Sequence, residues 1–81
     1  MGPIVFRDKG YRFYFLSRDK QEMHVHVVSA DGEAKYWLEP TIKLANNFHY
    51  SEQQLSEIKM LIESHQDEII DAWLERFFDE S

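Results

Sequence analysis

The chain has 81 residues, a formal net charge of −6 and no cysteine. This length fits one domain, and a hydrophobic content of 43% with 15% aromatic residues supplies enough apolar matter for a core, which argues against disorder. The lack of cysteine excludes disulfides, thiolate zinc sites and cysteine nucleophiles. The apolar runs fall short of the roughly 18 residues of a membrane span, and the first residues do not form a signal-peptide pattern. We therefore expect a cytoplasmic protein that does not act at a membrane.

Charge is divided unevenly along the chain. Residues 52–81 hold nine acidic and two basic side chains, whereas residues 1–51 hold seven basic and six acidic ones. An acidic half repels phosphate backbones, so nucleic acid is a less favoured partner than protein.

The hydrophobic period changes from about 2 to about 3.6 near Ser51, which predicts an α+β fold. We expect a single domain over residues 1–81, with a small antiparallel sheet of three to four strands in residues 1–50. A long amphipathic acidic helix over residues 51–79 would pack on one face of this sheet. The segment Thr41–Tyr50 is ambiguous between a short strand and one helical turn. Alternation and turn signals place the strands at Ile4–Phe6, Tyr11–Leu16, Met23–Val28 and Ala34–Leu38.

The predicted helix begins with a capping box formed by Ser51 and Gln54. One apolar stripe would face the sheet and contains Leu55, Ile58, Ile62, His65, Ile69, Trp73 and Phe77. A second, offset stripe contains Ile70, Leu74 and Phe78. Two roles for this second stripe stay open: a kink near Ser64-His65 that folds the end back onto the core, or an interface for self-association or a protein partner.

Strand alternation divides the side chains of the sheet into two sets. The set expected to face the helix contains Phe13, Phe15, Val25, Val27, Tyr36 and Leu38. The opposite set contains Arg12, Tyr14, His24, His26, Lys35 and Trp37. We expect both imidazoles to face solvent, and the candidate binding residues on this face are Tyr14, His24, His26, Lys35 and Trp37.

Three hypotheses describe this outer face. In the first, the rings form a cross-strand cluster that stabilises the sheet and serves as a docking surface without a cofactor. In the second, His24 and His26 act as general acid and base of a small ribonuclease, with Lys35 and Arg12 on the phosphate. In the third, His24 and His26 bind a metal with Glu22 as the third ligand. His65, on the buried stripe, is expected to be a packed histidine.

Several segments in chain order resemble a known family, and with the helix start at Leu55 and Ile58 the resemblance extends over nearly the whole chain. They are Tyr11-Arg12-Phe13-Tyr14-Phe15, His24-Val25-His26-Val27, Ala34-Lys35-Tyr36-Trp37-Leu38-Glu39-Pro40, Leu44-Ala45-Asn46-Asn47-Phe48 and Asp71-Ala72-Trp73. This combination resembles the small prokaryotic proteins known as domain of unknown function 4160. One departure is Glu22-Met23, where the family usually has Pro-Pro before the His-x-His pattern.

The resemblance implies a component of a two-gene module of the toxin–antitoxin type, without indicating the toxin or the antitoxin side. It implies no established biochemical activity. The leading hypothesis is a non-enzymatic protein that binds a protein encoded in the same operon, or a second copy of itself as a dimer. The acidic C-terminal helix and the His/Lys/Trp face of the sheet would make that contact.

Overall fold

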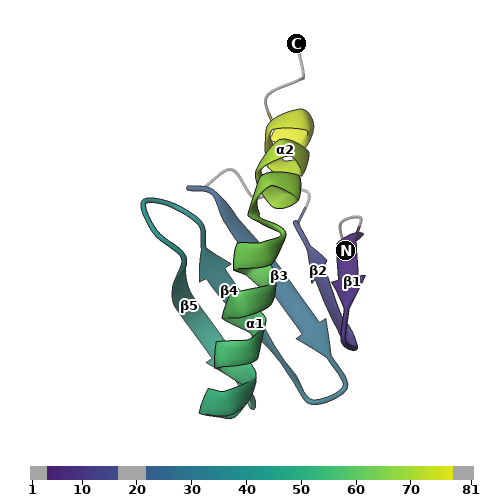
Figure 1. Ribbon diagram of the computed structural model, residues 1–81, viewed down its shortest axis with the longest axis vertical. Helices are drawn as coiled ribbons and strands as arrows, with labels where there is room; N and C mark the ends of the chain where they lie inside the picture. The colour runs from purple at the N-terminus through teal and green to yellow at the C-terminus, as the bar shows by residue number, and fades with distance from the viewer. Residues whose placement is uncertain (1–3, 17–21, 78–81) are drawn as a thin grey trace.

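The structure, a computed structural model, describes residues 4–16 and 22–77 (Figure 1). These residues form one antiparallel sheet and two helices. In chain order the elements are β1 (Ile4–Asp8), β2 (Tyr11–Tyr14), β3 (His24–Ser29), β4 (Gly32–Trp37), β5 (Lys43–Phe48), α1 (Glu52–Ser64) and α2 (Gln66–Phe77). Neither helix of the described ranges has the length and apolar character needed to cross a bilayer.

The sheet is a meander in which each strand pairs with the next along the chain, in the order β1-β2-β3-β4-β5. A two-residue turn joins β1 to β2, and its residues Lys9 and Gly10 have φ angles of 53° and 85°. Two consecutive positive φ angles are the signature of the hairpin turns that match strand twist. At the β3–β4 turn, a Cβ on Gly32 would collide with the carbonyl oxygen of Phe48, so only glycine fits beside β5.

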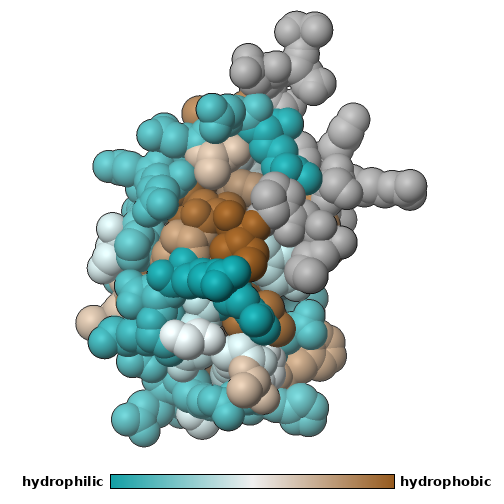
Figure 2. Space-filling view, turned by 90° about the vertical axis from the view of Figure 1, so that its right-hand side faces the viewer, coloured by the Kyte–Doolittle hydropathy of each residue, from teal (hydrophilic) through white to brown (hydrophobic). Residues whose placement is uncertain are grey.

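Each strand at an edge of the described sheet contains a bulge. In β1 the extra residue is Val5, between the pairs Ile4–Tyr14 and Phe6–Phe13. In β5 it is Ala45, between the pairs Leu44–Tyr36 and Asn46–Lys35. Bulges twist an edge and interrupt its hydrogen-bonding pattern, which discourages pairing with another strand. Figure 2 looks onto the β1 side, where an apolar patch is bordered by hydrophilic side chains.

Both helices lie on the same face of the sheet, and α2 continues past the ends of the strands (Figure 1). Alternation explains the core between the layers, because Phe13, Val25 and Val27 point towards the helices and are completely buried. From the helices, the buried members of the predicted stripe are Ile58, Ile62, Ile69 and Trp73. The predicted inward set and the predicted helical stripe are confirmed for these residues.

Helix α1 is attached to the sheet by tyrosines. The Tyr36 hydroxyl donates to the carbonyl oxygen of Leu55 at 3.0 Å, and the Tyr11 hydroxyl donates to Glu57 at 3.2 Å. Burial raises the pKa of Tyr36 to about 12, because the phenolate would be desolvated. The predicted capping box is present, since Ser51 and Gln54 bond each other's backbone N–H groups.

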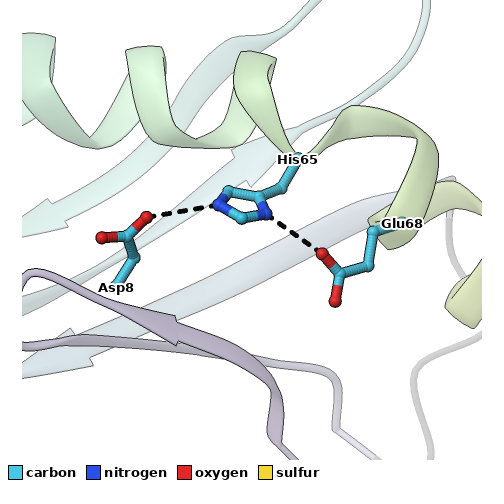
Figure 3. A network of polar contacts seen from close by, with 3 residues as sticks. All are labelled: Asp8, His65 and Glu68. Atoms are coloured by element: carbon cyan, nitrogen blue, oxygen red, sulfur yellow. Dashed lines mark hydrogen bonds and ion pairs between the residues drawn. The ribbon is translucent and has the colours of Figure 1, made fainter.

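The helical segment breaks at His65, without glycine or proline (Figure 3). The His65 ring stacks on Phe6 with the centroids 4.0 Å apart. Its Nε2 lies 3.2 Å from Asp8 of β1 and its Nδ1 lies 3.0 Å from Glu68 of α2. Since ionised carboxylates only accept hydrogen bonds, the ring satisfies both contacts when both of its nitrogens carry a proton, and the two carboxylates favour this imidazolium form. These contacts fix the break against β1.

The α+β architecture is therefore confirmed, with two differences in detail. The ambiguous segment Thr41–Tyr50 contains a fifth strand, so the sheet exceeds the expected three to four strands. The single long helix is wrong, and the alternative of a kink near Ser64-His65 describes the chain. Figure 1 shows that α2 nevertheless extends beyond the sheet.

We predict that stability falls as pH rises through the folded-state pKa of His65. The hydrogen bond to Glu68 raises this pKa above 6.5, partial burial opposes the rise and Asp8 adds to it. The folded state thus binds the proton more tightly, and the stabilisation is complete below about pH 6.5 and is lost at higher pH. Urea unfolding between about pH 5.5 and 8 measures this.

Three variants test the assignment to His65. His65→Gln should flatten the decline with pH, and Glu68→Gln should weaken it. Glu63→Gln, which changes an exposed carboxylate near the end of α1, should retain the decline. An unchanged decline in His65→Gln would contradict the assignment.

Candidate functional site

The face of the sheet opposite the described helices is the candidate site, and strand register orders its side chains into rows. One row crosses all five strands with directly opposed partners. It begins with two arginines and ends with an aromatic ring that is 59% exposed. Its members are Arg7, Arg12, Val28, Glu33 and Phe48.

A second row lies beside the first and consists of Ile4, Tyr14, His26, Lys35 and Asn46. The Tyr14 and His26 rings stack with centroids 5.2 Å apart and an interplanar angle of 24°. Four members of this row line a shallow hollow of about 320 Å³, namely Tyr14, His26, Lys35 and Asn46. Its other lining residues are Leu16, Glu33, Ala34 and Phe48. Aromatic, aliphatic, cationic and acidic groups therefore surround one depression.

The third row pairs His24 with Trp37 and Trp37 with Lys43. The Lys35 ammonium lies 4.5 Å from the centre of the Trp37 ring, a cation–π arrangement. This contact covers one side of the indole and holds Lys35 in place. The prediction that Lys35, Trp37, Tyr14 and His26 gather on one face is confirmed.

His24 departs from the expectation that both imidazoles face solvent, because its side chain is completely buried. Its ring packs against Trp73 of α2 at 5.2 Å, His26 at 5.1 Å and Trp37 at 5.7 Å. Alternation correctly places His24 beside Trp37. However, α2 extends past the strand ends, and its indole covers this first residue of β3. His24 is therefore a link between the outer face and the core.

This burial bears on the ribonuclease and metal hypotheses. The Nδ1 atom of His24 lies 2.7 Å from the Glu22 carbonyl oxygen, which only accepts, so Nδ1 carries a proton. A completely buried imidazole in this arrangement does not reach a dissolved substrate. In the described ranges, no three His, Asp or Glu side chains converge on a metal-sized space, and Glu22 contributes its backbone rather than its carboxylate.

The expected interface stripe on α2 is divided by the fold. Ile70 packs against the core, whereas Leu74 remains 42% exposed. Phe78, the third member, lies outside the described residues. The stripe as predicted thus offers Leu74 alone as an exposed apolar group from its described part.

Several apolar residues of the outer face were not assigned to it from the sequence, among them Phe48 and Ile4. Phe48 lies in β5, where the pair Asn46-Asn47 obscured the alternation, and Ile4 begins β1, where alternation has few residues to act on. Strand register is the feature that assigns both residues to the outer face, because Phe48 lies opposite Glu33 and Ile4 lies opposite Tyr14.

We predict that the two histidines differ in their effect on stability. His24→Ala removes a buried ring in contact with two tryptophans and should lower the free energy of unfolding by about 2–4 kcal/mol. His26→Ala removes a partly exposed cross-strand ring and should cost less than about 1 kcal/mol. Urea unfolding followed by tryptophan fluorescence measures both. Equal losses would contradict the distinct environments of the two rings.

Comparison with known families identifies one, described as Domain of unknown function (DUF4160), over residues 10–74. Comparison with curated proteins and with solved structures finds no match. The matched range begins at the β1–β2 turn and ends in α2, so it contains His24, His26, Lys35 and Trp37 of the outer face together with Trp73, which covers it. Because the match covers well over half of the sequence, this chain belongs to the DUF4160 family.

Proposed function

We propose that this protein is a non-enzymatic component of a two-gene module of the toxin–antitoxin or mobile-element type. In this proposal it acts in the cytoplasm by binding a protein partner through the outer face of the sheet. The observation that carries the proposal is the hollow lined by Tyr14, His26, Lys35 and Phe48 on a face that the described helices leave uncovered.

The composition of this face supports a protein partner. Aromatic residues and arginine are enriched at protein interfaces, and binding energy concentrates in a few large side chains surrounded by a polar rim. Phe48 and Leu16 provide exposed apolar groups, while Arg12 and Glu33 provide charged groups around them.

The fixed geometry of the face also supports binding. Tyr14 stacks on His26, and Lys35 lies over Trp37. Side chains that are already held by neighbours lose little rotamer freedom when a partner arrives, which lowers the entropic cost of association. We infer that the face is preorganised for a partner of complementary shape.

Two features favour this function over the ribonuclease alternative. The buried His24 ring does not suit a general acid or base. The Lys35 ammonium over Trp37 occupies the surface on which a nucleobase would stack. Metal binding receives no support from the described side chains, since no third ligand joins the two histidines.

We predict that Phe48→Asp weakens binding of the protein encoded by the adjacent gene at least about tenfold, because it places a charge at the exposed apolar part of the face. Isothermal titration calorimetry of the purified pair measures the affinity. The control is Met60→Asp, which makes a similar change at a side chain that is 65% exposed on α1. The control should bind like the wild type.

Two results would overturn the proposal. One is a strictly monomeric protein that does not bind the product of the neighbouring gene. The other is growth arrest or RNA cleavage on expression that disappears in His26→Ala, since this would assign catalysis to the same face.

A further inference from the structure

A groove between β1 and α2 lies outside the hollow described above. It has a volume of about 700 Å³, within the range of ligand-binding clefts. Residues from β1 and α2 form its two sides, with Phe15 following β2 between them. Figure 2 shows this side of the molecule, with its apolar patch open to the viewer.

The groove has an apolar part. Ile4, Val5, Phe15 and Ala72 line it, and Ile4 is 38% exposed. The Phe15 ring is buried and braced edge-to-face by Trp73 at 5.2 Å, so this part of the lining is rigid. When an apolar group of a ligand covers this surface, both are removed from water and the free energy of the system falls.

The α2 side of the groove is acidic. Glu68, Asp71 and Glu75 line it, together with a single basic residue, Arg76. The carboxylates of Asp71 and Glu75 belong to exposed residues, and Glu68 uses one oxygen to hold His65. With Glu68 engaged by His65, Asp71 and Glu75 still outnumber Arg76, which gives the groove a negative field that favours a cationic occupant and repels nucleic acid.

We propose that this groove binds a short extended segment of a protein partner, in which lysine or arginine alternates with aliphatic residues. Successive residues of an extended segment point in opposite directions. One set would therefore meet the carboxylates of α2, and the other would cover Ile4 and Val5.

The spacing of the acids matches such a segment. Positions 71 and 75 are about 6 Å apart along a helix axis, at about 1.5 Å per residue. Alternate residues of an extended chain are about 6.6 Å apart. The bulge at Val5 interrupts the edge of β1, so recognition depends on side chains rather than on an added strand.

A fluorescence-anisotropy titration with three labelled peptides tests this. The first alternates lysine with isoleucine over six residues, the second replaces isoleucine with serine, and the third replaces lysine with glutamate. The lysine–isoleucine peptide should bind at least about tenfold more tightly than either of the others, because only it satisfies both sides of the groove.

Two double variants with the same change in net charge locate the binding. Asp71→Asn/Glu75→Gln should weaken binding of the lysine–isoleucine peptide at least about tenfold. Glu52→Gln/Glu63→Gln, which changes exposed acids of α1, should leave it within about twofold. Equal weakening in both variants, equal binding of the lysine–serine peptide, or no binding of the lysine–isoleucine peptide overturns the proposal.

Two further measurements distinguish the groove from the outer face and from self-association. Phe48→Asp should leave peptide binding unchanged, so failure of the outer-face proposal is distinguishable from failure of this one. Sedimentation velocity of the wild type and Asp71→Asn/Glu75→Gln tests a second copy as the occupant. A wild-type dimer that the double variant converts to a monomer would overturn the assignment to a partner segment.

Discussion

The contact of His65 with Asp8, Phe6 and Glu68 determines where α2 lies. The His65 ring joins the start of α2 to the end of β1 through a ring stack and two hydrogen bonds, which are charge-assisted when the ring is protonated. This placement brings Trp73 over the end of β3 and forms the groove beside β1. Both candidate surfaces therefore depend on one partly exposed histidine.

His24 links the position of α2 to the packing of the outer face. Its ring contacts Trp73 on the helical side and His26 and Trp37 on the sheet. A displacement of α2 would change the packing of His24 and, through it, the rings that line the outer face. Such residues serve stability and recognition together, so a variant at His24 does not isolate either role. Phe48, which lies at the margin and is largely exposed, is a cleaner probe of recognition.

Features that depend on residues close together in the sequence were predicted correctly. Alternation placed Val25 and Val27 in the core, and the capping box located the start of α1, because each depends on neighbours in sequence. Burial of His24 depends on Trp73 of α2, which lies far along the chain and reaches past the end of the strand. Strand alternation contains no information about such a distant contact. The break at His65 likewise has no glycine or proline signal, since Asp8 and Phe6 come from a distant strand. The polar pair Asn46-Asn47 hid β5, since an edge strand needs few apolar residues.

The two surfaces differ in charge, and this has a consequence for assembly. The outer face holds Arg7, Arg12 and Lys35 against Glu33, whereas the groove is acidic. Complementary patches on one chain favour head-to-tail contacts, which form open chains unless the rotation closes a ring. The bulges at Val5 and Ala45 disfavour the simplest contact of this kind, edge-to-edge strand pairing. A single partner that presents an acidic and aromatic surface to the sheet and a basic segment to the groove would satisfy both patches at once. Linking two contacts in this way raises their effective concentration, so each one can be individually weak.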